Sequence, residues 1–434
     1  MYPSLRSTPV AETPVVGAPL VETPEGKAIA ANTRRERVGG TVFALGTVSL
    51  LTDISSEMVA AVLPIYLTVA LGLSPLAFGV IDGVYQGATV FLRLAGGYVS
   101  DRVGRPKAVC QVGYGLSAVT KLGLIAAGGQ VGPLTVVVAL DRGGKGIRTA
   151  PRDALIAGSV HPSILGRAFG VHRAMDTAGA MAGPLWAFGL LLMLPGDYNS
   201  LFLTSFVIAV LGCLVLWAFV REPVAKPGQR TGRMRDVLQL LRQPAFGRLA
   251  LASGGLALFS VSDGFLYLGL RDLGAVRIAY FPLLFLGAAA VYLALAIPLG
   301  RLADRFGRTK VLIGGHVALL GSYLVLLAGE ALPDALVLAG VLALLGLYYA
   351  ATDGVFAAVA AALSPPSVRG SGIAVVQTAV AGGRLLSAVL FGLLWTLFSQ
   401  QLALVCFAVA LLAVLPLATG CLRVCDRVGA AADA

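Results

Sequence analysis

Twelve long runs of apolar residues, separated by Gly, Pro or short charged stretches, occupy most of the chain. Each run is long enough for an α-helix that crosses the hydrocarbon core of a bilayer. The pattern predicts spans at 42–70, 77–99, 107–127, 133–157, 168–194, 201–220, 247–270, 280–299, 310–329, 335–362, 371–397 and 402–420. We therefore expect an all-α membrane protein with twelve transmembrane helices.

Composition and charge agree with a membrane protein. The chain has 434 residues, of which 57% are hydrophobic and 13% are charged, far from the balance of a soluble domain. The net charge of +11 does not indicate nucleic-acid binding, because most Lys and Arg residues lie in the N-terminal tail and alternate loops. The opposite loops hold Arg271 and Arg277. This asymmetry predicts a multi-pass protein of the cytoplasmic (inner) membrane with both termini in the cytoplasm.

The polar segments suggest a division into two halves. Residues 1–40 are rich in Pro and Thr and are expected to form a disordered cytoplasmic tail. The basic stretch 221–246 contains Lys226-Pro227-Gly228 and separates six predicted spans from six. We expect an N-terminal six-helix bundle at 41–220, a cytoplasmic linker at 221–246, a C-terminal bundle at 247–421 and a cytoplasmic tail at 422–434.

A short basic turn occurs twice, about half a chain length apart. Gly97-Tyr98-Val99-Ser100-Asp101-Arg102-Val103-Gly104-Arg105-Pro106-Lys107 and residues 300–310 both read Gly-x-x-x-Asp-Arg-x-Gly-Arg-x-Lys. The first glycine of each copy permits close helix approach and the second permits a sharp turn. The aspartates lie where a span leaves the membrane, and they can pair with the arginines, which alternatively contact lipid phosphates.

This doubled turn, between spans two and three and again between spans eight and nine, resembles the signature of the major facilitator superfamily. The resemblance covers residues 42–420 and implies a secondary transporter with two pseudo-symmetric six-helix bundles. It also implies that both turns form a gate on the cytoplasmic side. The gate residues are Gly97, Asp101, Arg102, Gly104, Arg105, Gly300, Asp304, Arg305, Gly307 and Arg308.

Two carboxylates lie deep in the first predicted span, in Thr52-Asp53-Ile54-Ser55-Ser56-Glu57. Asp53 is about 16 Å along the helix from its start. Asp53 and Glu57 are four residues apart and therefore share one helix face. Buried carboxylates at this depth cost roughly a few kcal/mol each unless they are paired, hydrated or protonated. This predicts a proton-coupling or substrate role, and a structural ion pair is the alternative.

Span four carries the expected counter-charges. Asp141, Lys145, Arg148 and Arg152 follow one helical stripe, and Arg142 points elsewhere. Arg142-x-x-Lys145-Gly resembles the family's Arg-x-x-Gln-Gly, in which the arginine is associated with proton transfer, but Lys145 replaces the glutamine. The stripe either binds an anionic substrate or neutralises the span-one carboxylates. Neutralisation is favoured because the charges nearly balance.

Span five contains Gly170, Gly179, Gly183 and Pro184 at separations of nine, four and one. This spacing resembles the antiporter branch of the family, Gly-x8-Gly-x3-Gly-Pro-x2-Gly-Gly, except that Ala187-Phe188 replaces the final glycine pair. Small residues at this spacing let another helix pack closely, and the proline bends the span. Ordinary helix packing is the alternative.

Two further carboxyl groups are candidates for the central cavity. Asp263 in span seven occupies roughly the position of Asp53 in span one, and Asp353 lies in span ten. Either residue can instead be a packed, protonated or hydrogen-bonded carboxyl with no transport role.

Other kinds of chemistry have no signature in the chain. There is no Gly-x4-Gly-Lys-Ser/Thr loop for ATP, and no Cys/His cluster has the spacing of a metal site. The five cysteines do not imply a disulfide framework. We expect no cofactor, no metal and no catalytic residues, so transport must draw on an ion or substrate gradient.

The sequence therefore predicts proton-coupled export of a small organic molecule by a monomer that contacts membrane lipid. Asp53 and Glu57 would carry or compete for the proton. The first alternative is proton-coupled uptake of an anionic metabolite bound by the span-four stripe. A receptor or lipid scramblase on the same fold is a third possibility. The residues do not specify the substrate.

Overall fold

The computed structural model describes residues 39–103, 105–161, 164–221, 243–364 and 369–432. Within these residues the chain is helical and contains no strand. The first half comprises α2 (Gly40–Ile65, continued by a π-helical turn at Tyr66–Ala70), α3 (Pro75–Val103), α4 (Pro106–Ala126), α5 (Val131–Gly158), α6 (Leu165–Met193) and α7 (Tyr198–Phe219). The second half comprises α9 (Pro244–Leu258), α10 (Asp263–Asp272), α11 (Phe281–Phe306), α12 (Arg308–Leu327), α13 (Asp334–Leu363), α14 (Arg369–Leu397) and α15 (Gln400–Ala432).

These helices coincide with the twelve predicted spans, the seventh of which is divided between α9 and α10. Among the described residues, nine segments are long and apolar enough to cross a membrane. The segments outside that set, α3, α5 and α6, have 29, 28 and 29 residues and are therefore also long enough. The fold class expected from the sequence is confirmed.

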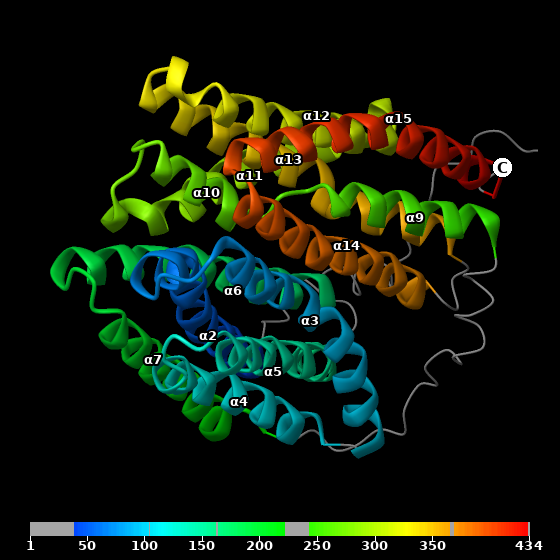
Figure 1. Cartoon of the computed structure of the whole chain (residues 1–434). Helices are drawn as coiled ribbons and strands as arrows, with labels where there is room; N and C mark the ends of the chain where they lie inside the picture. Colours follow the sequence, from blue (N-terminus) through cyan, green and yellow to red (C-terminus); the bar gives the residue numbers. More distant parts are fainter. Residues whose placement is uncertain (1–38, 104, 162–163, 222–242, 365–368, 433–434) are drawn as a thin grey trace, which may run out of the picture.

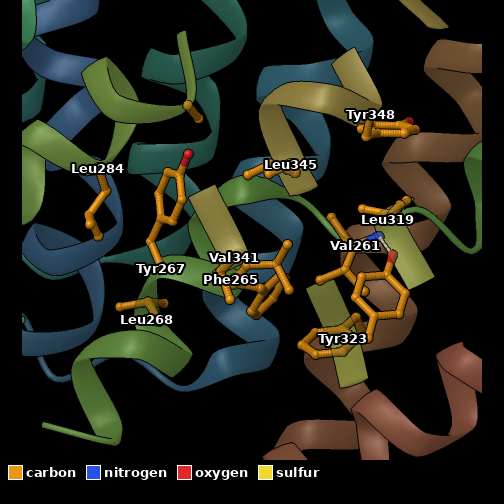
Figure 2. Packing of buried hydrophobic residues seen from close by; sticks show 14 of the residues in the cluster. Val261, Phe265, Tyr267, Leu268, Leu284, Leu319, Tyr323, Val341, Leu345 and Tyr348 are labelled. Carbon is orange, nitrogen blue, oxygen red and sulfur yellow. Dashed lines mark hydrogen bonds between the residues drawn. The ribbon is translucent and has the colours of Figure 1, made fainter. Parts of the chain in front are cut away.

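The seventh span is broken in the middle, where the sequence pattern predicts one helix at 247–270. Residues 259–262 are non-helical and join α9 to α10. The Tyr323 hydroxyl of α12 accepts from the Val261 N–H at 2.7 Å (Figure 2). It also donates to the Phe259 carbonyl at 3.0 Å. The Ser387 hydroxyl of α14 donates to the Ser260 carbonyl at 2.8 Å. Side chains of neighbouring helices thus satisfy the backbone groups that the break exposes, as a broken helix inside a membrane requires.

The helices form two groups. Figure 1 shows α2 to α7 on one side and α9 to α15 on the other. Contacts between the groups come mainly from α3 against α14, with further contacts of α11 against α6 and α2. The predicted linker residues 222–242 and the tail 1–38 lie outside the described residues. The last helix continues to Ala432, beyond the predicted end of the span at residue 420.

The α3–α14 interface, which we define as residues 75–87 of α3 and 385–396 of α14, is closely packed. A Cβ at Gly79 would lie 2.3 Å from the Ala388 carbonyl oxygen, and one at Gly83 would lie 2.8 Å from that of Leu385. The Leu76 N–H donates to the Thr396 hydroxyl at 2.8 Å. Small residues let the two backbones approach within contact distance, which is the usual basis of helix association in membranes.

Candidate transport site

Among the described residues, the span-one carboxylates form ion pairs with one cation. Lys145 Nζ of α5 lies 3.9 Å from Asp53 Oδ1 and 3.6 Å from Glu57 Oε1 of α2. The Asp53 side chain is 10% exposed, whereas those of Glu57 and Lys145 are 29% and 33% exposed. The structure therefore brings Asp53, Glu57 and Lys145 together, and two of the three are open to an approaching molecule. We call these three residues the Lys145 cluster.

Glycines of α6 hold this helix against the carboxylate-bearing helix. A Cβ at Gly179 would lie 2.4 Å from the Leu50 carbonyl oxygen of α2. A Cβ at Gly183 would lie 2.8 Å from the Ile54 carbonyl oxygen and 2.9 Å from Glu57 Cβ. The close packing expected at these two glycines is therefore present, and it is centred on the turn of α2 that carries Asp53 and Glu57.

The other residues of the span-five pattern behave differently. Pro184 lies inside α6 and is buried. Gly170 has no described atom of another element within 4 Å of its would-be Cβ. Of the four pattern residues, only Gly179 and Gly183 therefore require the absence of a side chain.

A second ion cluster is buried between α4 and α5. Asp141 Oδ1 accepts from Lys121 Nζ at 2.7 Å, and Asp141 Oδ2 accepts from Arg142 Nε at 3.0 Å. The Arg142 guanidinium lies over the Tyr85 ring of α3, 4.1 Å from its centroid. A cavity of about 20 Å³, close to the volume that one water requires, is lined by these four residues and eight others. The one carboxylate is thus paired with two cations, which suits a permanent ion cluster.

The stripe predicted on span four does not face one partner. Arg148 is buried against α4, where Nη1 donates to Ser117 Oγ at 3.1 Å and the guanidinium lies 4.3 Å from the Tyr114 ring centroid. Arg152 turns toward α2 and α6, with Nη1 3.8 Å from Asp176 Oδ1. Lys145 alone of the predicted stripe cations contacts the span-one carboxylates among the described residues.

The second-half candidates are also separated. Asp263 is the first residue of α10, and its Oδ1 accepts from the Tyr349 hydroxyl of α13. The Arg384 guanidinium of α14 lies 5.9 Å from the Tyr349 ring centroid. Asp353 lies on α13 with an exposed side chain. Asp263 is therefore partly buried and hydrogen-bonded within the protein, whereas Asp353 is exposed.

The first of the two predicted gate turns is only partly described. Gly97, Asp101 and Arg102 lie in the last turns of α3, and their side chains are outside the described residues. Gly104 is also outside them. Arg105 is exposed and directly precedes α4. The predicted pairing of Asp101 with arginine stays a prediction.

The second gate turn has the predicted sharp bend. Gly307 adopts φ 101° between α11 and α12, a conformation that side chains disfavour. Arg308 Nη2 lies 3.9 Å from Asp304 Oδ1, and both side chains are exposed. Arg305 stacks on the neighbouring phenylalanine. A Cβ at Gly300 would meet no described atom within 4 Å, so the close approach predicted there is not seen.

Three residues of these clusters have roles that the sequence patterns did not predict. Lys121, Tyr85 and Tyr349 supply contacts to Asp141, Arg142 and Asp263, respectively. Lys121 could have been found because it is a lysine in an apolar run with no acidic residue near it in sequence. Such a lysine needs a buried partner. Tyrosines in apolar runs are too common to indicate a contact. Among the described residues no group of three or more His, Cys, Asp or Glu side chains is arranged to hold a metal ion.

Comparisons with known proteins agree with this architecture. The family model described as Major Facilitator Superfamily matches residues 45–291 and 271–429. An uncharacterized MFS-type transporter of Methanocaldococcus jannaschii is 30% identical over 371 residues, which cover 83% of this chain and 89% of that protein. An uncharacterized protein of Mycobacterium tuberculosis is 35% identical over 158 residues, 36% of this chain and 38% of that protein.

Solved structures share the fold. The nucleoside transporter NupG superposes with a TM-score of 0.76 at 14% identity, covering 89% of this chain and 100% of that one. The POT family transporter PepTSo superposes with a TM-score of 0.73 at 13% identity, covering 90% and 99%. At these identities the likeness extends to the fold alone. Together with the family match and the M. jannaschii relative, it shows that the chain belongs to the major facilitator superfamily, as a multi-pass membrane protein that is a secondary transporter and not an enzyme.

Proposed function

We propose that the protein exports a small organic molecule from the cytoplasm in exchange for protons, as a monomer in the cytoplasmic membrane. The bundles 41–220 and 247–421 rock about a central cavity and expose it alternately to the two sides. The observation that carries this proposal is the Lys145 cluster, in which one cation lies between two carboxylates and two of the three side chains are partly exposed.

The charge balance of the cluster suits exchange. Lys145 can neutralise one carboxylate, so Asp53 and Glu57 together keep one uncompensated negative charge at membrane depth. A bare charge in that position is costly. A proton or a positively polarised part of the substrate removes the cost, and each therefore displaces the other. Competition for one site is the simplest basis of antiport.

The packing of α6 supports coupling between the Lys145 cluster and the second helix group. Gly179 and Gly183, two residues of the antiporter-like pattern, place α6 in contact with the turn of α2 that carries the cluster. A change in the charge of Glu57 therefore acts directly on the contact between α2 and α6. Helix α6 also contacts α11 of the other group. This path connects the charge state of the cluster to the relative position of the two groups.

Loop charges support the assignment of sides. The basic tail and loops place the N-terminus and the turns at 97–107 and 300–310 in the cytoplasm. The start of α3 and the end of α14 then lie at the outer surface. With this assignment, the contact between these ends corresponds to a conformation that is closed toward the outside.

The alternative, uptake of an anionic metabolite, needs the predicted basic stripe as a binding surface. Arg148 is instead buried against Ser117 and Tyr114, and Arg152 turns toward Asp176. That leaves Lys145 as the stripe cation beside the span-one carboxylates. A lone lysine beside two carboxylates is a poor site for an anion.

A two-stage experiment tests the proposal. Thermal stabilisation of the purified protein by a panel of organic cations, neutral compounds and anions first identifies a ligand. That ligand is then followed in proteoliposomes with an imposed proton gradient. Wild-type protein should accumulate it against its gradient, whereas Asp53→Asn and Glu57→Gln should lose gradient-driven accumulation by about 10-fold or more but retain exchange. Unchanged gradient-driven transport in Asp53→Asn would contradict the role of Asp53 in proton coupling.

Lys145 provides a charge test of the cluster. In Lys145→Met the two carboxylates lose the cation that lies 3.9 Å and 3.6 Å from them, so two uncompensated charges are left at membrane depth. Gradient-driven transport should therefore fall by about 10-fold or more. Lys145→Arg keeps the charge and should stay close to wild type. Unchanged transport in Lys145→Met contradicts the proposed balance.

A further inference from the structure

We propose that the cavity beside Lys121 and Arg142 binds a small monovalent anion of the charge and size of chloride. The cavity lies inside the first helix group, where side chains of α2, α4 and α5 and Tyr85 of α3 form its wall. This wall includes none of the residues of the Lys145 cluster. The site goes beyond the proposed exchange reaction, because it needs neither the transported molecule nor a proton gradient.

The charged side chains in the cavity wall do not balance. Lys121 and Arg142 carry two positive charges, and Asp141 is the one carboxylate among the described residues that line the cavity. These three residues are 2%, 4% and 7% exposed, so water does little to screen the excess. Tyr85 presents its ring face to the guanidinium but carries no negative charge. A net charge of +1 is thus buried at membrane depth, where it is costly.

The negative excess of the Lys145 cluster does not replace the missing charge. Glu57 follows Ser56 of the cavity wall in the chain, so its side chain leaves α2 about 100° further around the helix. There it forms an ion pair with Lys145, and the two side chains are 29% and 33% exposed. Charges that are open to water act weakly on a group buried at another helix face. An anion inside the cavity, in contrast, neutralises the excess at contact distance.

The two cations have donors for a second acceptor. Lys121 Nζ donates to Asp141 Oδ1 at 2.7 Å, and a lysine ammonium has three N–H groups. Arg142 donates to Asp141 Oδ2 from Nε and Nη2, and a guanidinium has five N–H groups. Ser56, which also lines the cavity, carries a hydroxyl donor. An acceptor without protons of its own matches such a wall, and a halide ion is an acceptor of that kind.

The cavity has room for a single small guest. Its volume is about 20 Å³. This is above the roughly 10–15 Å³ that one water needs and far below the roughly 300–1,000 Å³ of pockets for organic ligands. A water molecule would satisfy hydrogen bonds but would leave the net charge in place, and a metal cation would add to that charge. Size and charge together therefore select a monatomic anion.

Close helix packing on both sides of the cavity keeps it from collapsing. Helices α4 and α5 run along each other (Figure 1). On one side of the cavity, a Cβ at Gly144 would lie 2.6 Å from the Gly113 carbonyl oxygen. On the other side, a Cβ at Gly123 would lie 3.0 Å from Val137 Cγ2. The charged wall residues of both helices lie between these two contacts, so the site is formed before any ion binds.

Thermal melting of the full chain in detergent tests the site with chloride as the probe. The sodium concentration and ionic strength are held constant while gluconate is exchanged for chloride. The melting temperature should rise saturably, by about 2 °C or more at about 150 mM chloride, because an ion that binds the folded state stabilises it. Bromide should act like chloride, whereas sulfate, which is larger and doubly charged, should not.

Two variants change the charge of the site in opposite directions. Lys121→Met leaves one cation for one carboxylate and should abolish the response to chloride. Asp141→Asn raises the excess to two positive charges, so it should melt below wild type without chloride and show a larger rise with chloride. Lys310→Met is the matched control, because Lys310 is an exposed lysine of α12. Its response should equal that of wild type.

Bromide diffraction locates the ion without any variant. Crystals of the wild-type chain grown with bromide should show an anomalous peak in the cavity, between Lys121 Nζ and the Arg142 guanidinium. Peaks confined to the protein surface would mean an adventitious ion only and would overturn the proposal. Equal melting temperatures in chloride and gluconate would also overturn it, as would a chloride response that is unchanged in both Lys121→Met and Asp141→Asn. Since the Lys145 cluster stays intact, failure of this site leaves the transport proposal standing.

Discussion

The ion clusters inside the first helix group differ in the ratio of cations to carboxylates. Asp141 meets two cations, Lys121 and Arg142, and all three side chains are buried. Lys145, in contrast, is shared by two carboxylates and is partly exposed. An excess of cations holds a carboxylate in its ionised form, whereas an excess of carboxylates leaves room for a proton. The first arrangement suits a structural role and the second suits exchange.

This difference predicts that Asp141 matters for stability. In Asp141→Asn, Lys121 and Arg142 keep their buried charges but lose the carboxylate that pairs with both. Breaking a buried ion pair in this way costs about 3–5 kcal/mol. We expect a clear fall in the free energy of unfolding, measured by denaturant titration in detergent. The exposed carboxylate variant Asp197→Asn provides the comparison, and equal stability of the two variants would contradict the structural role of the cluster.

At the scale of helices, two glycines of the span-five pattern, Gly179 and Gly170, predict opposite results. Gly179→Ala places a methyl group 2.4 Å from the Leu50 carbonyl oxygen, so α6 must move away from α2. Overpacking of this kind costs about 1–3 kcal/mol. Gly170→Ala meets no described atom within 4 Å and gains helix propensity of up to about 1 kcal/mol. The melting temperature should fall in the first variant and stay or rise in the second; the reverse order would rule out the packing role.

Tyr323 satisfies two of the backbone groups that the break between α9 and α10 exposes. Tyr323→Phe removes the hydroxyl that serves both the Val261 N–H and the Phe259 carbonyl. Each buried backbone group left without a partner costs about 1–3 kcal/mol. The variant should unfold at a lower temperature than wild type. Tyr280→Phe, which removes the hydroxyl of a partly exposed tyrosine, is the control and should melt close to wild type.

The sequence predicted the positions of the helices well because hydrophobic runs of membrane length are set by composition alone. The break at 259–262 escaped prediction, since the segment contains no Pro or Gly and is stabilised by Tyr323 and Ser387 from distant spans. The sequence correctly predicted that the charged residues of span four are spaced along one face of the helix. Its side chains nevertheless reach different neighbours, because a long side chain on a helix edge can turn to either adjacent helix.

Within the candidate site, Asp53 and Glu57 could be found from local sequence, since charges in an apolar run stand out. Charge balance favoured a span-four cation beside them, but it did not single out Lys145 from Arg148 and Arg152. The pairing of Lys121 with Asp141 could not be predicted, because it depends on how far α4 and α5 are displaced along each other. Helical periodicity gives the face of a helix but not its height relative to a neighbour.

For the whole molecule, alternating access requires the α3–α14 interface to open and close during each cycle. Leu76 and Thr396 are in contact across it, through a 2.8 Å hydrogen bond between the Leu76 N–H and the Thr396 hydroxyl. A disulfide between Leu76→Cys and Thr396→Cys, in a background without native cysteines, should therefore lock the interface. Transport in proteoliposomes should fall by about 10-fold or more on oxidation and recover on reduction, because one half of the cycle becomes inaccessible.

A disulfide inside one helix group is the matched control. The Ser55 and Ser205 hydroxyl oxygens of α2 and α7 lie 2.8 Å apart within the first group. Oxidation of Ser55→Cys with Ser205→Cys ties together two helices that move as one body and should leave transport near its reduced level. If the disulfide between residues 76 and 396 forms fully and transport continues, the interface does not open during transport. The two helix groups then do not rock as rigid bodies about the cavity. If both disulfides inhibit equally, the groups are not rigid, because motion between α2 and α7 is then also required.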